Sequence, residues 1–148
     1  MLNEKILDLE IQMKNCIEFR ADRTLGRKNG GVITYIKTTE AVDAEQLIAK
    51  SNSYVEYQLI HIKQKQYFFI NVYRPPDFPT EKFSSPLNEL RTELIEIGNP
   101  MPNIIFTGDL NFPTIDWQME TADGGTHENQ VQANAFCNLH RNNAYSNI

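Results

Sequence analysis

The chain is poor in cysteine and has no long hydrophobic run. Its 148 residues include two cysteines, Cys16 and Cys137, which lie far apart without the spacing of a zinc site. We expect free thiols or core residues, which excludes a disulfide framework. No apolar run approaches the ~18–20 residues of a membrane-spanning helix, and residues 1–5 lack a signal-peptide pattern. We therefore expect an intracellular protein that is not secreted and has no membrane partner.

Basic charge is also scarce, since the formal net charge is −5. Non-specific binding of nucleic acid is expected to be weak for an acidic chain, because it depends on Lys and Arg side chains that neutralise the phosphates. Residues 20–28, with four basic side chains and one acid, form the only noticeable basic segment. This segment is either a local basic face or a solvated loop. The chain length and its 41% hydrophobic residues indicate one globular domain with a core.

Hydrophobic periodicity predicts helices and strands in mixed order. The first part should contain an amphipathic helix over residues 3–16, a polar loop over 20–29 and a strand over 32–36. Residues 38–53 are ambiguous, either a loop or a loop with a short strand near 47–48. Two further strands, 54–62 and 67–73, are separated by four residues, so the pattern predicts an antiparallel hairpin whose second strand is central.

The second half contains the clearest helix, over residues 85–98. Ser85 is a capping residue and Pro86 occupies the first helical position, while Gly98 ends the helix. Its apolar face comprises Leu87, Leu90, Leu94 and Ile97. A strand over 104–106 and a weaker helix over 128–142 follow, the latter with Val131, Ala135 and Leu139 on one side. This order of elements indicates a layered α+β fold.

The most informative stretch for chemistry is residues 103–113. An apolar run ends at Gly108, and Asp109 and Asn111 follow with one residue between them. In an extended backbone, side chains at i and i+2 point the same way. We therefore expect both to project from the end of a buried strand, where a carboxylate beside a carboxamide can orient a water or a metal-bound phosphate. The alternative is an ordinary turn, because all three residue types are common in loops.

Three segments resemble the endonuclease/exonuclease/phosphatase superfamily, which includes AP endonucleases and deoxyribonucleases. They are residues 27–32 (Arg-Lys-Asn-Gly-Gly-Val), 70–76 (Ile-Asn-Val-Tyr-Arg-Pro-Pro) and 107–111 (Thr-Gly-Asp-Leu-Asn), in this order. The second segment and the longer stretch 108–117 are most similar to the endonuclease domain of LINE-type (jockey-like) non-LTR retrotransposons. The resemblance extends from about residue 19 to about residue 140.

This resemblance implies a four-layered α/β sandwich and a phosphodiesterase that uses Mg²⁺ or Mn²⁺. It implies DNA as the partner and, in a functional retroelement, a nuclear location. By the same resemblance, Tyr73 hydrogen-bonds the scissile phosphate and Asp109 orients or deprotonates the attacking water. Asn111 would steady the phosphate or the surroundings of the metal, so Asp109 and Asn111 are metal contacts of a shared or indirect kind.

The chain departs from this family towards both ends. Before Gly30 the metal-binding glutamate motif has no match, since Glu18 lies among dissimilar neighbours, and the final aspartate-histidine pair has no match either. We therefore expect a single partial domain over 1–148, truncated at both ends, with exposed apolar faces and unpaired strand edges. The alternatives are a non-catalytic remnant or binding module, and another phosphoesterase of the superfamily, such as a sphingomyelinase or an inositol-phosphate phosphatase.

We expect the isolated chain to show little or no Mg²⁺-dependent nicking of DNA. Mg²⁺ is bound through few protein carboxylates, so the absence of one of them should greatly weaken metal binding. The measurement is conversion of supercoiled plasmid to the nicked form. Nicking that the substitution Asp109→Ala abolishes would contradict this expectation.

Overall fold

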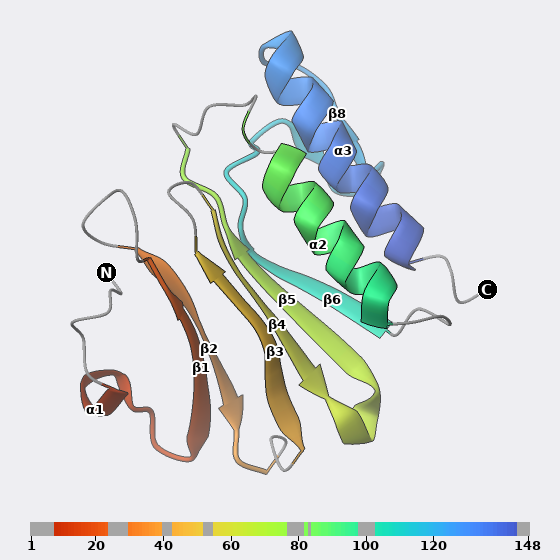
Figure 1. Ribbon diagram of the computed structural model, residues 1–148. Coiled ribbons are helices and arrows are strands. Elements are labelled where there is room, and N and C mark those ends of the chain that lie inside the picture. The colour runs from red at the N-terminus through yellow and green to blue at the C-terminus, as the bar shows by residue number, and fades with distance from the viewer. Residues whose placement is uncertain are drawn as a thin grey trace. The chain divides into compact units, whose positions relative to one another are not determined.

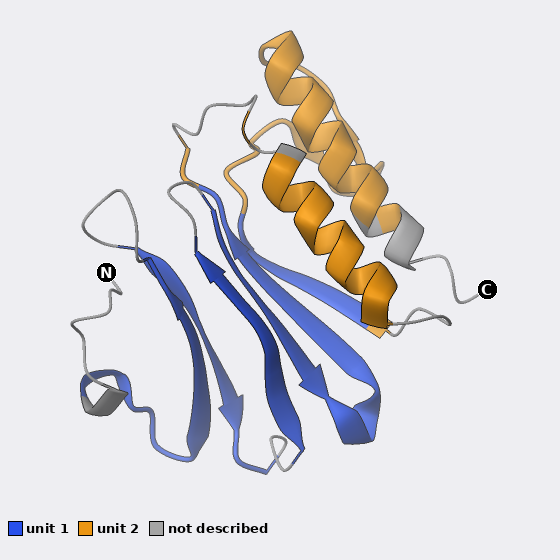
Figure 2. Ribbon diagram, viewed as in Figure 1, with its two compact units in different colours: residues 1–74, 104–109 blue, residues 75–103, 110–148 orange. Residues whose placement is uncertain are grey.

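The computed structural model describes most of the chain, and its fold is a mixture of α and β elements. It describes residues 8–23, 30–39, 43–51, 55–76, 82, 84–97 and 103–144. The chain divides into two compact units, coloured separately in Figure 2. Unit 1 comprises residues 1–74 and 104–109, and unit 2 comprises residues 75–103 and 110–148. The predicted α+β class agrees with this architecture.

Unit 1 is built from two sheets (Figure 1). Strands β1 (Cys16–Asp22) and β2 (Gly31–Lys37) form an antiparallel pair after a short helix, α1 (Asp8–Ile11). The other sheet has the order β3-β4-β5-β6, and its strands are Ala44–Ser51, Glu56–Ile62, Tyr67–Tyr73 and Asn103–Asp109. β3, β4 and β5 are successive antiparallel neighbours, with a register shift in β3 between Gln46 and Ile48.

The hairpin of β4 and β5 confirms the prediction for this part of the sequence. A 3-10 turn, η1 (Lys63–Lys65), joins the strands, and Gln66 closes it with a left-handed φ of 52°. The pairing runs from Ile62 opposite Tyr67 to Glu56 opposite Tyr73. β5 lies inside the sheet, as its apolar sequence predicts, and its alternate residues Phe68, Ile70 and Val72 are buried.

Hydrogen bonds of buried side chains join the two sheets of unit 1. The fully buried Gln58 of β4 donates from Nε2 to the carbonyl oxygens of Phe19 and Val32, at 2.9 Å each. Its Oε1 accepts a 2.8 Å hydrogen bond from Thr34 Oγ1. Opposite Gln58 on β5, Asn71 donates to the same Thr34 hydroxyl at 3.0 Å. This polar layer fixes the β1–β2 pair on the strands beneath it.

Unit 2 contains two helices and a small two-stranded sheet. The helices are α2 (Ser84–Ile97) and α3 (His127–Ala144), and the sheet pairs β7 (Ile115–Asp116) with β8 (Thr121–Ala122). α3 packs against both α2 and β8. It is tied to the small sheet by Asn134 Oδ1, which accepts from the amide of Ala122 at 3.0 Å, and by an Arg141–Glu120 ion pair at 3.2 Å.

Several predictions for the first 53 residues are wrong. The helix predicted over 3–16 is described only at 8–11, and Cys16 already belongs to β1, while residues 3–7 lie outside the described part. The loop predicted from residue 20 begins later, because β1 continues to Asp22 by pairing with β2. For the ambiguous stretch 38–53, the alternative with a strand near 47–48 is confirmed, and this strand, β3, is longer than expected. In all three segments, pairing with another strand decides the structure.

The two predicted helices of unit 2 are present, but the buried face of α3 differs from the prediction. Val131 and Ala135 are exposed, and only Leu139 of the predicted stripe is buried. The other buried residues are Gln132, Ala133, Phe136 and Cys137. In α2, Leu90 and Leu94 are buried as predicted, whereas Ile97 is exposed.

The described residues expose some apolar surface and two sheet edges. β3 and β6 are the edge strands of the larger sheet. Large exposed side chains include Ile105 on β6 and, in unit 2, Trp117 and Met119. No helix within the described ranges is long and apolar enough to cross a bilayer.

The substitution Gln58→Leu should lower the free energy of unfolding by about 2–4 kcal/mol, because two carbonyls and a hydroxyl would lose a buried partner. The matched control is Gln64→Leu, the same chemical change at an exposed position in η1, which should change stability by less than about 0.5 kcal/mol. Urea unfolding followed by circular dichroism measures both. Equal effects of the two substitutions would contradict the structural role of Gln58.

Candidate functional site

Two of the predicted site residues end neighbouring strands of one sheet. Tyr73 is the last residue of β5, and Asp109 is the last residue of β6. Directly after Tyr73, the backbone N–H of Arg74 donates a 2.9 Å hydrogen bond to the carbonyl oxygen of Asp109. The C-terminal ends of β5 and β6 therefore lie together at the same edge of the sheet (Figure 1). Phenol and carboxylate are thus carried on adjacent backbone segments, although they are 36 positions apart in the sequence.

Gly108 makes this close approach of the strands possible. It has a φ of +122°, and a Cβ atom there would lie 1.9 Å from the carbonyl oxygen of Val72. No side chain fits at that distance from a backbone atom. The glycine before Asp109 is therefore required by the packing of β6 on β5, which also sets the position of Asp109.

The strand that carries Asp109 is not buried, contrary to the prediction. All seven residues of β6 are exposed or half-buried, because β6 is an edge strand and not an internal one. The Asp109 residue itself is exposed. An exposed carboxylate at a strand end remains accessible to water, to a cation or to a substrate.

Asn111 does not continue the extended geometry of Asp109. β6 ends at Asp109, and Asn111 has a left-handed φ of 49°, which asparagine tolerates better than most residues. The extended backbone from which strand alternation predicts a shared direction for the two side chains therefore ends before Asn111. Asn111 is half-buried and belongs to unit 2, whereas Tyr73 and Asp109 belong to unit 1. Its convergence with them stays a prediction.

The ring of Tyr73 lies against a buried ion pair. The guanidinium carbon of Arg23 is 5.9 Å from the ring centroid, within the range of a cation–π contact. Arg23 also binds Glu56 with two nitrogens, Nε to Oε1 and Nη2 to Oε2, the latter at 2.8 Å. The side chains of Arg23 and Glu56 are 3% and 0% exposed. Because Glu56 stands opposite Tyr73 in the β4–β5 register, these three groups form one cluster.

Gly30 leaves the space that the Arg23 guanidinium occupies. A Cβ atom at position 30 would lie 2.4 Å from Arg23 Cζ. Gly30, the first of the two glycines in the segment 27–32, therefore has a local role, which is to admit the arginine beside Glu56. Residues 27–29 of the same segment lie outside the described residues. Sequence reasoning missed Arg23, since it lies in the basic stretch 20–28, for which a solvated loop was one interpretation.

A second buried cation, Arg74, stands at this edge of the sheet. The residue is 2% exposed. Burial lowers the pKa of the Arg74 guanidinium, although an arginine keeps its proton at neutral pH. The guanidinium of Arg23 thus lies against the ring of Tyr73, and Arg74 directly follows Tyr73 in the chain. Because Glu56 balances the charge of Arg23, that pair adds no net charge to the site.

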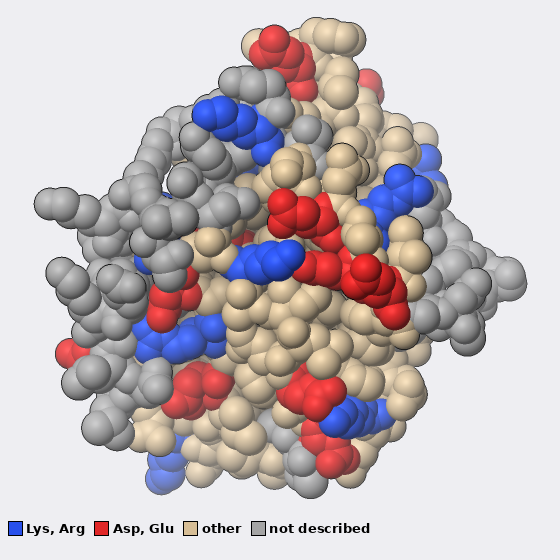
Figure 3. Space-filling model, in the orientation of Figure 1, with Lys and Arg blue, Asp and Glu red and all other residues tan. Residues whose placement is uncertain are grey.

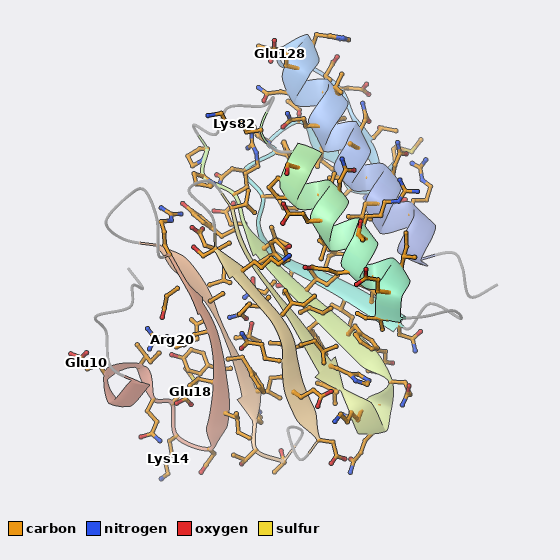
Figure 4. All side chains as sticks on the ribbon, in the orientation of Figure 1. Glu10, Lys14, Glu18, Arg20, Lys82 and Glu128 are labelled. Atoms are coloured by element: carbon orange, nitrogen blue, oxygen red, sulfur yellow. The ribbon has the colours of Figure 1, made fainter. Side chains whose placement is uncertain are left out.

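The residues at this edge fit a metal ion only in part. Within the described ranges, no group of three or more His, Cys, Asp and Glu side chains is placed to hold one. Glu18 lies on β1 (Figure 4) and pairs with Tyr35, so strand alternation puts it on the face opposite Thr34 and away from Gln58. Mg²⁺ often uses one or two carboxylates together with substrate phosphate and water. Asp109 fits such a shared ligand.

Neither cysteine adds a reactive thiol to this site. Both are free, as predicted, and Cys137 belongs to the buried face of α3. Burial raises the pKa of the Cys137 thiol, with the charge of Glu120 adding to the effect. The thiolate is the nucleophilic form, so this cysteine is a packing residue.

Surface charge gives no extended basic footprint in the view of Figure 3. Among the described residues on that face, Lys and Arg side chains are scattered among Asp and Glu side chains. This agrees with the net charge of −5. Any binding of a polyanion must therefore depend on local groups.

No protein-family model matches the chain, and no curated protein matches it significantly. The resemblance to the endonuclease/exonuclease/phosphatase superfamily therefore stays a prediction carried by the three sequence segments. The geometry of Tyr73 and Asp109 stands independently of it.

The substitution Gly108→Ala should lower the free energy of unfolding by about 2–4 kcal/mol, because the new methyl group meets the backbone of β5. Gly124→Ala is the matched control: Gly124 also has a positive φ, of +88°, but the nearest atom to an added Cβ is 4.0 Å away. It should cost only the backbone strain, about 1–2 kcal/mol. Chemical unfolding measures both, and a smaller loss at position 108 than at 124 would contradict the close contact.

Proposed function

We propose that this chain carries part of the active site of a divalent-metal-dependent phosphodiester hydrolase, of the endonuclease/exonuclease/phosphatase type, that acts on DNA in the nucleus. The observation that carries the proposal is the pairing of the strand ends after Tyr73 and at Asp109, through the hydrogen bond from Arg74 N to Asp109 O. This pairing supplies a donor and a carboxylate from adjacent strands. Within that superfamily we propose the endonuclease domain of LINE-type retroelements, because the sequences of segments 70–76 and 108–117 resemble that group most.

The proposed fold is the four-layered α/β sandwich of that superfamily. Support comes from unit 1, where the β1–β2 pair packs on the four-stranded sheet through Gln58 and Thr34. Two stacked sheets are the inner layers that such a sandwich requires.

The chemistry proposed for each residue follows from its functional group. Hydrolysis of a phosphodiester needs a water in line with the leaving oxygen and neutralisation of the charge on the phosphoryl oxygens. Asp109, an exposed carboxylate, would accept a hydrogen bond or a proton from that water. The Tyr73 hydroxyl would donate to a phosphoryl oxygen, and the amide of Asn111 would hold the phosphate without adding charge. Bound Mg²⁺ supplies charge neutralisation at the phosphate, and Asp109 is the described residue best placed to share it.

A second candidate function is binding without hydrolysis. The observation that favours it is the incomplete set of metal ligands in the described part of the chain. A module of this kind would still bind a phosphodiester through Tyr73, but it would not cleave the bond.

The experiment is a titration of the ¹⁵N-labelled chain with Mn²⁺ in the presence of a short DNA duplex, followed by nuclear magnetic resonance. Paramagnetic broadening should be strongest at the amides of residues 74, 108 and 109, and Asp109→Asn should reduce it. The control is Asp123→Asn, which removes an exposed carboxylate of unit 2 and should leave the broadening at β6 unchanged.

The result separates the candidates. Broadening spread evenly over the acidic surface would overturn the proposed site. Selective broadening at β6 supports the proposed site, whether or not the isolated partial domain cleaves the duplex. Cleavage of the duplex in Mg²⁺ would exclude the binding module, and it would contradict the expectation of little or no nicking.

A further inference from the structure

The roles proposed above include Tyr73 but not the two charged residues beside it, Arg23 and Glu56. Two opposite charges are almost completely removed from water, and a glycine is needed beside them. A buried ion pair adds little net stability, because desolvation of both ions offsets their attraction. Its effect on geometry is larger, since a bidentate arginine–carboxylate pair holds the guanidinium plane in one orientation. That plane lies against the ring of Tyr73.

We infer that the Arg23–Glu56 pair positions the phenol of Tyr73 for a phosphodiester ligand. This inference rests on the proposed function, which it deepens by adding two positioning residues. Glu56 fixes Arg23, and Arg23 restrains the ring through the 5.9 Å cation–π contact. The Tyr73 side chain is then already ordered before the ligand binds. Binding does not have to restrict its rotation, and such preorganisation strengthens binding.

The register of the sheet supports this role. Glu56 and Tyr73 are direct partners across β4 and β5, so the carboxylate cannot shift along the strand without moving the tyrosine. Gly30 admits the guanidinium, and the backbone N–H of Arg23 donates to the carbonyl oxygen of Gly30 at 3.3 Å. The β1–β2 connection thus presents Arg23 to the end of β5, where the site is proposed.

The test is ¹⁹F nuclear magnetic resonance of the chain labelled with 3-fluorotyrosine. The Tyr73 signal is assigned as the one that is missing in the variant Tyr73→Phe. The probe is the dinucleotide thymidylyl-thymidine in the presence of Mg²⁺. In the unmodified chain the Tyr73 signal should shift on titration. The double variant Arg23→Met/Glu56→Leu replaces the ion pair with apolar side chains and should keep the fold. Without ligand, its Tyr73 line should be narrower than in the unmodified chain, because the ring becomes mobile. The dissociation constant from the titration should rise about fivefold, because the Tyr73 side chain must then lose its conformational freedom when the dinucleotide binds.

The chain offers a matched control in the Arg141–Glu120 pair of unit 2. The variant Arg141→Met/Glu120→Leu makes the same chemical change and should leave both the line width and the titration of Tyr73 unchanged. The conservative variant Arg23→Lys retains the charge but not the planar fork, and should fall between the unmodified chain and the apolar double variant.

A folded Arg23→Met/Glu56→Leu variant with an unchanged Tyr73 line and unchanged titration would overturn the inference while the proposed function stands. No response of Tyr73 in the unmodified chain would overturn the proposed function and with it this role in ligand binding. If the double variant fails to fold, Gly30→Ala replaces it, because its added methyl group displaces the guanidinium while both charges remain. An unchanged Tyr73 titration in Gly30→Ala would then overturn the inference.

Discussion

The hydrogen bonds of the Gln58 side chain are the interaction on which unit 1 depends. A fully buried amide must find its partners inside the protein, and here they are two backbone carbonyls of β1 and β2 and a hydroxyl of β2. Apolar contacts alone would allow the β1–β2 pair to slide over the larger sheet, since they have no direction. Three directed bonds from one side chain allow a single register. Asn71, beside Gln58 on β5, adds its own bond to Thr34 and extends this restraint to the strand that ends at Tyr73.

The geometry of the candidate site depends on this fixed register of the two sheets. Once β1 and β2 are fixed on β4 and β5, the chain after β1 brings Arg23 to Glu56 and to the face of Tyr73. On the other side of β5, Gly108 lets β6 approach until the carbonyl oxygen of Asp109 accepts from the amide of Arg74. Gly30 and Gly108, which belong to two of the three segments of the family resemblance, thus have different structural roles. Gly30 makes room for a side chain, and Gly108 makes room for a neighbouring backbone.

Local sequence signals predicted those elements whose structure depends on nearby residues. The β4–β5 hairpin follows from two apolar runs joined by four polar residues, and α2 follows from its cap signals and its Leu90–Leu94 spacing. The failures concern segments whose partners are distant. β1 carries alternating polar residues that suit a helix end or a loop equally well, and it becomes a strand by pairing with β2. The buried stripe of α3 was misplaced because the surfaces of α2 and β8 select which face is covered, and periodicity alone does not.

The sequence by itself determined the α+β class, the hairpin and the main helix, which follow from residue type and from spacing over a few positions of the chain. It also predicted Asp109 and Asn111 as site residues, and Tyr73 through the family resemblance. Only the tertiary structure decided that β6 is an exposed edge strand, that Asn111 leaves the extended backbone, and that Arg23 and Glu56 stand against Tyr73. The physical reason is that a charge can be buried only beside its opposite partner. The partner of Arg23 lies 33 residues away, a distance over which composition and periodicity carry no information.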